Sequence, residues 1–427
     1  MSSVMIVAGE ASGDVHGAAL CTAIRRLSPD TRVLGMGGDR MRAAGAELLA
    51  DVSRRAGVGS TEVVSKIPGL YRVYRRLRAT LEREPPSVLV LIDFPEFNLR
   101  LARVARRLGV PVVYFVPPQI WAWRGGRIKT IRRLVSLVLA VFPFERALYA
   151  DAGVSAEFVG HPVVDALAGA PSRAEARHAL GLDDGTLVIG LLPGSRHGEA
   201  ARMLPLMTAT AGRLLTRWPK ARFVVAQAVT LEDDFVAQVL NGAPAIRVVR
   251  DATHAVMRAA DLLVVTSGTA TLEAALLGTP MIVCYRVSWL SELMAHLLVR
   301  VPWINLVNLT LGRAVVPEFR LHHEVTVDRL AAEVERLVDD PAARDTQRAA
   351  FDELHVQLGE PGVSMRAAQL VLGGGLRPPI SITEGLGSPP EGGSPRDTIG
   401  PPGPDGAFLP ASPQKTDWAG KARARTS

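Results

Sequence analysis

The sequence contains few cysteines and no long apolar run. Cys21 and Cys284 are its two cysteines, and each lies inside an apolar periodic segment. A disulfide framework is therefore not indicated, and we expect a reducing compartment. No apolar run approaches the roughly 18–20 residues that span a bilayer. The first residues, 1–7, lack the charged region and the cleavage site of a signal peptide. We expect a cytoplasmic protein, or one that is peripheral on the inner face of a membrane.

The sequence also lacks the features of a nucleic-acid-binding protein, although its net charge is +7. Arginine and lysine concentrate in three segments, at 66–78, 100–107 and 124–133. No recognition helix and no platform of interleaved aromatic residues accompanies these segments. Anionic lipid is therefore the expected partner of the basic surface, and nucleic acid is not.

Two nucleotide-binding motifs are missing as well. The first strand is not followed by the Gly-x-Gly-x-x-Gly spacing of dinucleotide-binding proteins. No Asp-x-Asp motif is present to hold a divalent metal against a nucleotide diphosphate. We therefore expect no cofactor and no metal.

Apolar strands alternate with amphipathic helices through both halves of the chain, which is typical of parallel α/β sheets. The expected strands of the first half are Val4–Ala8, Arg32–Met36, Val88–Ile92, Pro111–Val116 and Leu137–Phe142, with helices at 18–27, 97–108 and 126–134. Those of the second half are Leu187–Leu191, Arg222–Ala226, Ala245–Val249, Leu262–Val265 and Met281–Tyr285. We predict an α/β protein in which two Rossmann-like domains face a cleft.

Composition places the domain boundaries. Polar, alanine-rich sequence follows the first set of strands, so residues 1–165 are expected to form one domain and 166–372 the second. Residues 373–427 contain 11 Gly and 10 Pro among 55 residues and few large apolar side chains. This tail is expected to be disordered and to have no catalytic role.

The first strand runs into a glycine-bearing segment, 9–17, which is predicted to be a strand-to-helix turn. Such turns lie at the carboxyl edge of a parallel sheet, where ligands bind. The segment supplies candidate residues for the N-terminal side of an active-site cleft, namely Gly9, Glu10, Ser12, Asp14 and His16.

The third strand of the first half ends at Asp93, a position where catalytic groups collect in doubly wound folds. Asp93 is a candidate general base, with Glu96 and Asn98 in support. The alternative is that Asp93 or Asn98 only caps the next helix. Trp121 and Trp123 follow a neighbouring strand and are expected to line the same cleft, unless they are buried plugs of the core.

Two turns of the second half have groups that suit a diphosphate. The first offers a hydroxyl and a guanidinium at a strand-to-helix turn, and the second opens a helix after a buried strand. Glu273 falls about one turn into that helix, within reach of a ribose. The alternatives are a loop arginine in water and an ordinary helix start. The candidate residues are Ser195, Arg196, Ser267, Gly268, Thr269 and Glu273.

Residues 62–78 combine an apolar stripe with basic residues. This composition is typical of a helix that lies on a membrane surface. It equally fits an ordinary helix that faces the core and has a solvated basic face. The stripe consists of Ile67, Leu70, Tyr71, Tyr74 and Leu77.

These features together indicate a glycosyltransferase that uses a nucleotide sugar. A carboxylate on one domain and a diphosphate cradle on the other suit an in-line displacement at an anomeric carbon. That geometry inverts the configuration of the sugar. Arg196 and the helix N-termini at Ser195 and Ser267 are expected to neutralise the diphosphate in place of a metal.

Over roughly residues 4–370 the chain resembles the lipid-A-disaccharide synthases, glycosyltransferase family 19. The motifs that carry the resemblance lie in the family's order, at 9–16, 92–98, 121–124, 142–145, 160–162, 192–196 and 267–273. It implies a GT-B type enzyme that joins UDP-2,3-diacylglucosamine to 2,3-diacylglucosamine 1-phosphate (lipid X). The products are the β-1,6-linked tetraacyl disaccharide 1-phosphate and UDP. Implied partners are the anionic inner-membrane surface and a second copy joined by exchange of C-terminal segments.

The resemblance also implies roles for individual residues. Asp93 matches the family's essential carboxylate, Arg196 its phosphate arginine and Glu273 its ribose ligand. Asn308 matches an asparagine near the donor, although the family usually has proline before it. Glu96 stands where aspartate is usual. The stretch 317–320 departs from the family's usual Leu-Gln ending. Because the substrates carry acyl chains, the resemblance favours the membrane interpretation of residues 62–78.

Two other classes of function stay open at this point. One is another enzyme of the same architecture, a UDP-N-acetylglucosamine 2-epimerase or a transferase that acts on a lipid-linked peptidoglycan precursor. The other is a non-catalytic protein that only docks sugar nucleotides or lipids. Intact Asp93, Arg196 and Glu273 argue against the second.

Overall fold

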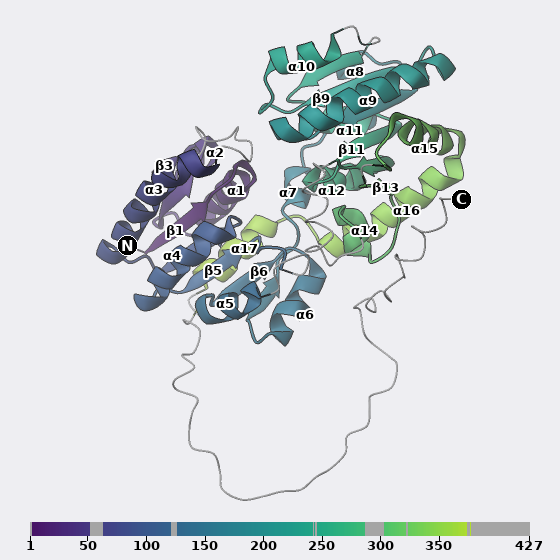
Figure 1. Ribbon diagram of the computed structural model, residues 1–427. Helices are drawn as coiled ribbons and strands as arrows, with labels where there is room; N and C mark the ends of the chain where they lie inside the picture. Colours follow the sequence, from purple (N-terminus) through teal and green to yellow (C-terminus); the bar gives the residue numbers. More distant parts are fainter. Residues whose placement is uncertain are drawn as a thin grey trace, which may run out of the picture. The chain divides into compact units, whose positions relative to one another are not determined.

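The computed structural model describes residues 2–51, 63–120, 126–241, 243, 246–286, 303–321, 323–373 and 376, without the side chains of 11 and 63–67. Within these residues the chain forms two parallel sheets with helices between successive strands (Figure 1). This confirms the predicted α/β class with two Rossmann-like sheets. No helix in the described ranges is long and apolar enough to cross a membrane.

The first sheet has seven strands in the order β3-β2-β1-β4-β5-β6-β7, and all of its pairings are parallel. The strand β4 has five apolar residues that are all buried, and it pairs with β1 and β5 near the centre of the sheet. The bounds are β1 (Ser3–Ala8), β2 (Arg32–Gly37), β3 (Glu47–Asp51), β4 (Val88–Ile92), β5 (Val112–Phe115), β6 (Leu137–Ala140) and β7 (Ala156–Phe158).

The second sheet has six strands in the order β10-β9-β8-β11-β12-β13, again all parallel. Its central strands, β8 and β11, are buried along their whole length. The bounds are β8 (Val188–Leu192), β9 (Arg222–Gln227), β10 (Ile246–Arg250), β11 (Leu262–Thr266), β12 (Met281–Cys284) and β13 (Glu318–Phe319).

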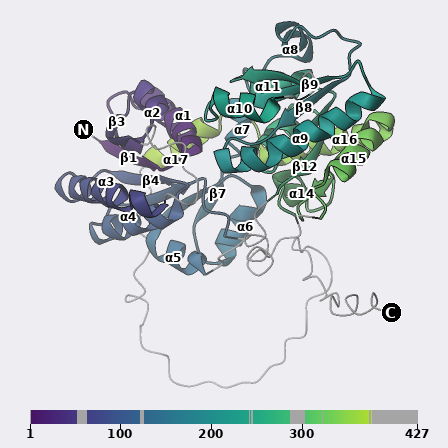
Figure 2. The ribbon, with the colours of Figure 1, turned by 45° about the horizontal axis from the view of Figure 1, so that its top comes forward.

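Helices connect these strands and pack on both sheets (Figures 1 and 2). Their bounds are α1 (Ala11–Leu27), α2 (Asp39–Ala43), α3 (Val63–Arg83), α4 (Pro95–Arg107), α5 (Arg127–Leu134), α6 (Pro143–Asp151), α7 (Val163–Ala166), α8 (Arg173–Ala179), α9 (His197–Arg217), α10 (Asp233–Leu240), α11 (Thr253–Ala259), α12 (Thr269–Leu276), α14 (Leu306–Leu311), α15 (Val327–Asp339), α16 (Pro341–Leu358) and α17 (Val363–Leu372).

The predicted turn at 9–17 is wrong, because α1 begins at Ala11. Glycine disfavours helix interiors, but here a tertiary contact decides. A Cβ on Gly17 would lie 2.5 Å from Sδ of Met41, so glycine lets α1 and α2 approach each other closely. Ser12, Asp14 and His16 therefore lie in the first turns of a helix rather than in a loop.

In each sheet the strand order reverses at one point, and this is where ligands bind in open α/β folds. The reversal lies between β1 and β4 in the first sheet and between β8 and β11 in the second. The residues that follow these four strands begin at Gly9, Asp93, Pro193 and Ser267. All four segments were singled out from the sequence.

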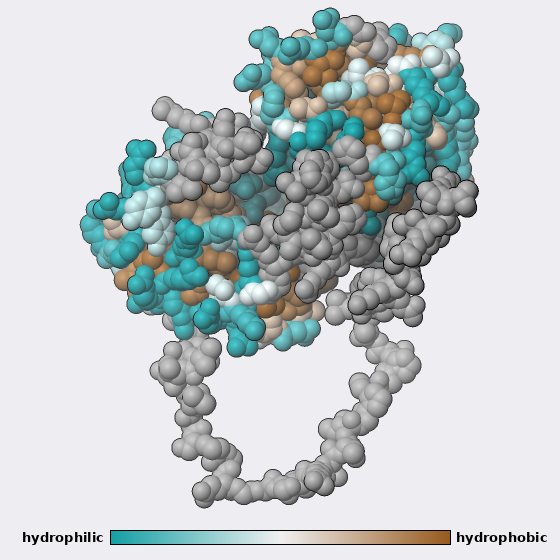
Figure 3. All heavy atoms as spheres, in the orientation of Figure 1, coloured by the Kyte–Doolittle hydropathy of each residue, from teal (hydrophilic) through white to brown (hydrophobic). Residues whose placement is uncertain are grey.

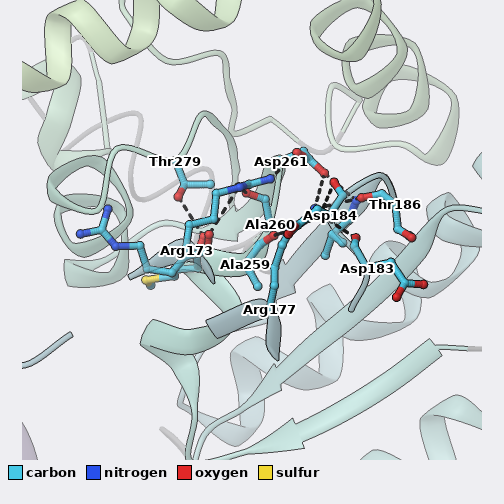
Figure 4. Close-up of polar contacts among 12 residues, drawn as sticks. Arg173, Arg177, Asp183, Asp184, Thr186, Ala259, Ala260, Asp261 and Thr279 are labelled. Atoms are coloured by element: carbon cyan, nitrogen blue, oxygen red, sulfur yellow. Dashed lines mark hydrogen bonds and ion pairs between the residues drawn. The ribbon is translucent and has the colours of Figure 1, made fainter. Parts of the chain in front are cut away.

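A buried arginine fastens the amino ends of β8 and β11 (Figure 4). The side chain of Arg177 is 2% exposed, and its Nη2 bonds Oδ2 of Asp261 at 3.0 Å. The same carboxylate oxygen accepts the N–H of Val188 at 2.8 Å. Nη2 also donates to the backbone carbonyl of Thr186, and the other two nitrogens donate to those of Ala259, Asp183 and Asp184. These bonds satisfy a buried charge and hold together the two strands beside the second reversal point.

The chain passes between the two halves at 159–166 and again at 358–366, and these crossings are bonded to each other. The carboxylate of Asp165 accepts the N–H groups of Gly362, Val363 and Ser364 at 2.6, 3.2 and 3.1 Å. It therefore caps the N-terminus of α17. The N–H of His161 donates to the carbonyl of Leu358 at 2.9 Å. From there α17 packs against α1.

Candidate active site

Asp93 lies immediately after the central strand β4 in an unusual backbone conformation. Asp93 and Phe94 have φ values of 50° and 45°, in the left-handed region that non-glycine residues rarely adopt. Phe94 occupies the N-cap position of α4, and no side chain caps the helix. Neither Asp93 nor Asn98 occupies the N-cap position, and the catalytic role of Asp93 stays a prediction. Strained backbone of this kind persists where the surrounding structure holds it, and it is concentrated at functional sites.

Two buried side chains hold this backbone. Nδ2 of Asn98 donates to the carbonyl oxygens of Asp93 and Ile92 at 2.7 and 3.1 Å. The hydroxyl of Tyr114 donates to the same Asp93 carbonyl at 2.8 Å. Asn98 is 0% exposed, so it cannot contact a substrate. The predicted support of Asp93 by Asn98 is therefore support of its backbone, and Asn98 is a positioning residue.

Carboxylates from the first sheet and an arginine from the second influence one another. Burial raises the pKa of the Asp93 carboxyl, while the Phe94 N–H and Arg196 lower it and Glu96 raises it. Partial loss of hydration raises the pKa of Glu10, and Asp93 raises it further while Arg196 lowers it. The reversal points of the two sheets thus contribute to one electrostatic environment. Glu96 itself forms an ion pair with Arg127 and is exposed.

Arg196 lies at the N-cap position of α9, beyond the end of β8. Its side chain is 73% exposed, and Nη1 bonds Oε1 of Glu199 at 3.0 Å. A partial loss of hydration lowers the pKa of the guanidinium, but Glu199 and then Glu10 raise it, and the net shift is upward. Arg196 is therefore an exposed arginine with one ion-pair partner, and its binding of a phosphate stays a prediction. Ser195 is exposed beside it, and its carbonyl accepts the hydroxyl of Thr230.

The N-terminus of α12 is open. Gly268 is the N-cap residue with φ 156°, it is exposed, and a Cβ added to it would meet no atom within 4 Å. Thr269 is exposed next to it, while Oγ of Ser267 donates to the carbonyl of Ile304 at 3.0 Å. Free N–H groups and the positive helix end at this position suit an anionic group.

Glu273 lies one turn further along α12, close to two histidines. Its Oε2 is 3.6 Å from Nε2 of His254, and its side chain is 22% exposed. Burial lowers the pKa of His16 to about 4, and the charge of Glu273 raises it. His16 belongs to α1 and Glu273 to α12, so this pair, like Asp93 and Arg196, links residues of the two halves.

Known proteins match the chain over almost the same range as the motifs of the predicted family, roughly residues 4–370. A family model described as lipid-A-disaccharide synthetase matches residues 4–372. The lipid-A-disaccharide synthase of Geobacter sulfurreducens is 45% identical over 370 residues, which cover 86% of this chain and 96% of that protein. The synthase of Myxococcus xanthus is 42% identical, with the same coverage. The chain belongs to the lipid-A-disaccharide synthase family. It is therefore a glycosyltransferase of lipid A biosynthesis.

Solved structures of other proteins share the fold of this family member. A UDP co-structure of MnaA from S. aureus matches with a TM-score of 0.61 and 13% identity, over 87% of this chain and 96% of that one. The glycosyltransferase of kitacinnamycin matches with a TM-score of 0.57 and 18% identity, over 87% and 98%. At these identities the likeness concerns the fold alone. It confirms the predicted GT-B architecture.

One residue that was predicted to line the cleft has a structural role. Asp14 is 7% exposed, and its carboxylate accepts the N–H groups of Gly38, Arg40 and Met41 at 2.6, 3.1 and 3.1 Å. It therefore caps α2 from 24 or more residues away in the sequence. Ser12 is exposed on the first turn of α1, and Gly9 is partly buried before it.

Asn308, which the resemblance placed near the donor sugar nucleotide, is also buried in a structural network. It is 0% exposed. Its Oδ1 accepts the N–H groups of Val315 and Val316, and its Nδ2 donates to the carbonyl of Val316. All of these bonds shape the loop before β13. The assignment of Asn308 as a residue that contacts the donor does not fit a side chain satisfied in this way.

The other expected site residues lie in the core, on the surface or outside the described ranges. Trp121 and Trp123 lie outside the described residues, as does the side chain of Ile67. On α3, Leu77 is fully buried in the core, so it cannot face a membrane, and Leu70 and Tyr74 pack partly against that core. Tyr71 is 60% exposed.

A cavity of about 670 Å³ lies at the amino edge of the first sheet. It is lined by residues from the beginnings of β1 and β4 and from the end of α17, among them Val4, Val88 and Leu372. Asp93 follows the carboxyl end of β4, so this cavity is at the opposite edge of the sheet. It is not part of the candidate active site.

Proposed function

We propose that this enzyme transfers the 2,3-diacylglucosaminyl group of UDP-2,3-diacylglucosamine to the 6-hydroxyl of lipid X. The products are the β-1,6-linked tetraacyl disaccharide 1-phosphate and UDP. The observation that carries the proposal is the match of residues 4–372 to the lipid-A-disaccharide synthases, in a chain that has Asp93 beyond β4 and Arg196 beyond β8. One group is suited to removing a proton and the other to holding a diphosphate, and both follow strands at the reversal points of their sheets.

In the proposed mechanism Asp93 takes the proton of the acceptor 6-hydroxyl while that oxygen attacks the anomeric carbon of the donor. The bond from the anomeric carbon to the diphosphate breaks, and UDP leaves with the electron pair. Attack and departure occur on opposite faces, so the configuration inverts. The raised pKa of Asp93 suits a base that must accept a proton and later release it. Residues 1–165 bind the acceptor, and 166–372 bind the donor.

Donor binding is assigned to the second half. Arg196 and the N-terminus of α12, with Gly268 and Thr269, neutralise the developing charge on the diphosphate. Glu273 accepts hydrogen bonds from the ribose hydroxyls, and the open surface around Gly268 supports a ligand there. Because the chain has no Asp-x-Asp motif, we expect EDTA to leave turnover unchanged. Strong inhibition by EDTA would contradict this assignment.

The activity is tested with purified full-length protein, both diacylated substrates and detergent, while UDP and disaccharide are measured. Disaccharide should form in a one-to-one ratio with UDP. An absence of disaccharide in every detergent would overturn the proposal. Parallel incubation with UDP-N-acetylglucosamine tests for epimerisation and for transfer to a lipid-linked peptidoglycan precursor. Product from either reaction, without disaccharide, would favour those enzymes. Binding of UDP without any turnover would favour a non-catalytic protein.

We further propose that the enzyme binds the inner face of the inner membrane through α3 and its surroundings. Tyr71 is exposed there among exposed arginines, including Arg72, Arg75 and Arg76. Figure 3 shows hydrophobic residues interspersed with hydrophilic ones over α3 and α4. Such a surface favours anionic lipid. Binding to vesicles that contain phosphatidylglycerol should weaken with salt and with Arg75→Glu and Arg76→Glu. Salt-independent binding would contradict the proposal.

A homodimer formed by exchange of C-terminal segments is also proposed. The packing of α17 against α1 supports it, since an element that reaches the other half of its own chain can reach the same place on a second copy. Light scattering on the full-length protein measures the mass, and a monomer at all concentrations would exclude exchange.

A further inference from the structure

The proposed diphosphate arginine is bonded to Glu199, which is bonded in turn to Tyr285, and no role was predicted for either residue from the sequence. Oε1 of Glu199 accepts Nη1 of Arg196 at 3.0 Å. The same oxygen accepts the hydroxyl of Tyr285 at 3.3 Å. Arg196 precedes α9, Glu199 is in its first turn, and Tyr285 directly follows β12. Two separate parts of the second half, the start of α9 and the segment after β12, therefore meet at one carboxylate oxygen.

The structure provides space for this carboxylate. The side chain of Glu199 is only 12% exposed. Gly194 has φ 100°, and a Cβ at that position would lie 3.0 Å from Oε2 of Glu199. A side chain at 194 would therefore be strained and would press on the carboxylate. Tyr285 is partly buried, and loss of hydration and the charge of Glu199 raise the pKa of its hydroxyl, which therefore stays a hydrogen-bond donor at neutral pH.

A largely buried carboxylate so close to a diphosphate site requires an explanation, because its charge repels the ligand. An acidic residue in the first turn of a helix is favoured by the helix dipole. The dipole accounts for the presence of Glu199. It does not account for the hydrogen bond from the Tyr285 hydroxyl to Oε1 of Glu199, the oxygen that also binds Arg196. Arginine has five N–H donors in a planar fork. With Nη1 bonded to Glu199, Nε and Nη2 have no acceptor among the described residues and are available for two phosphate oxygens.

We propose that Glu199 and Tyr285 are positioning residues that hold Arg196 ready for the β-phosphate of the donor. The inference rests on the proposed function of Arg196. An exposed arginine populates many rotamers, and binding must select one of them. Glu199 restricts the guanidinium before the ligand arrives, and Tyr285 restricts Glu199. Neither residue contacts the ligand in this account. Their effect therefore depends on Arg196 and on the presence of a β-phosphate.

The test compares UDP with UMP, which lacks the β-phosphate, by calorimetry on the full-length enzyme. Tyr285→Phe removes only the hydroxyl, and we expect it to weaken UDP binding about fivefold while UMP binding changes less than about twofold. Glu199→Ala should weaken UDP binding more. Glu199→Gln keeps an acceptor oxygen for both donors and should restore much of the loss.

Arg202→Gln is the matched control. Nε of Arg202 donates to the carbonyl of Arg286 at 3.1 Å, so it also fastens α9 to the segment after β12, without touching Arg196. If Tyr285 only fastens these elements, Arg202→Gln and Tyr285→Phe should weaken UDP and UMP binding alike, which would overturn the inference. Under the inference, Arg202→Gln leaves the preference for UDP over UMP unchanged.

The Arg196→Ala background separates the proposed function of Arg196 from the positioning role of Tyr285. We expect Arg196→Ala to remove most of the preference for UDP, and Tyr285→Phe to have no further effect in that background. If Arg196→Ala keeps the full preference, the proposed function of Arg196 fails. If Arg196→Ala loses the preference but Tyr285→Phe weakens UDP binding equally with and without Arg196, the positioning role alone fails.

Discussion

Nδ2 of Asn98 donates a hydrogen bond of 2.7 Å to the backbone carbonyl of Asp93. The contact fixes the main chain of the proposed base and leaves its carboxylate unoccupied by the amide. Because Asp93 has a left-handed conformation at the end of β4, this bond helps to hold a strained peptide in place. Asn98 therefore acts on the reaction through Asp93 and not through the substrate.

The Asp93 carbonyl accepts a second hydrogen bond from Tyr114, and its loss should have small but measurable effects on stability and turnover. Tyr114→Phe removes the hydroxyl that bonds Asp93 O at 2.8 Å and preserves the buried ring. We expect the free energy of unfolding to fall by about 1 kcal/mol and kcat to fall several-fold, because the carboxylate is less well held. Denaturant unfolding and the disaccharide assay measure the two effects. The hydroxyl of Tyr149 donates to the carbonyl of Pro118 instead, so Tyr149→Phe should leave kcat unchanged.

Asp14 should matter for stability and not for chemistry. Asp14→Ala leaves three backbone N–H groups at the start of α2 without their acceptor. The expected loss is about 2 kcal/mol in the free energy of unfolding. Asp39→Ala on the same helix removes an exposed carboxylate and should cost less than about 0.5 kcal/mol. A large loss of kcat in Asp14→Ala at a temperature where the variant is folded would return Asp14 to the active site.

Because Arg177 is buried and Arg173 is half-exposed, we expect Arg177→Lys to reduce stability much more than Arg173→Lys. Arg177→Lys keeps the charge but cannot reproduce five hydrogen bonds from a planar group. We expect a loss of about 3 kcal/mol in stability. Arg173→Lys changes a half-exposed neighbour that bonds the same aspartate and should cost about 1 kcal/mol or less. Equal losses in the two variants would show that burial of Arg177 is not the reason.

Two histidines make stability depend on pH. Burial lowers the pKa of His161 to about 3 and that of His16 to about 4, below the ordinary 6.5. The unfolded chain therefore takes up protons first, and the stability present above pH 6.5 is lost as the pH falls toward these values. Each histidine contributes a slope of about 1.4 kcal/mol per pH unit. His161→Asn retains an acceptor for the Val163 N–H and should remove one such slope. An unchanged slope would contradict the burial of a neutral His161.

Most of the strands that could be predicted from the sequence are buried on both faces, and the predicted edge strand β10 is the exception. Val88–Ile92 is an apolar run with no alternation, and the structure has a strand with the same bounds. The strand β3 begins and ends with acidic residues, and β7 has only three residues, so neither gives a periodic signal. Short edge strands depend on their neighbours for hydrogen bonds rather than on their own composition.

The sequence could predict which candidate site residues follow the ends of buried strands. It could not predict which side chains contact one another. Asp93 and Arg196 follow buried strands, so topology alone brings them to the sheet edges. Asp14 was misassigned because its partners lie 24 to 27 residues away, and no local pattern marks that distance. Glu199 was missed because an acidic residue in a first helical turn is common, and its partner Tyr285 is 86 residues later.

The central claim is that the base lies on the first sheet and the diphosphate site on the second. The most direct measurement is the turnover of Asp93→Asn together with its affinity for UDP. The account predicts that kcat falls by about a thousandfold or more, since a required proton acceptor is lost, while the dissociation constant for UDP changes less than about twofold. Undiminished turnover, or equal losses of turnover and of UDP affinity, would contradict it.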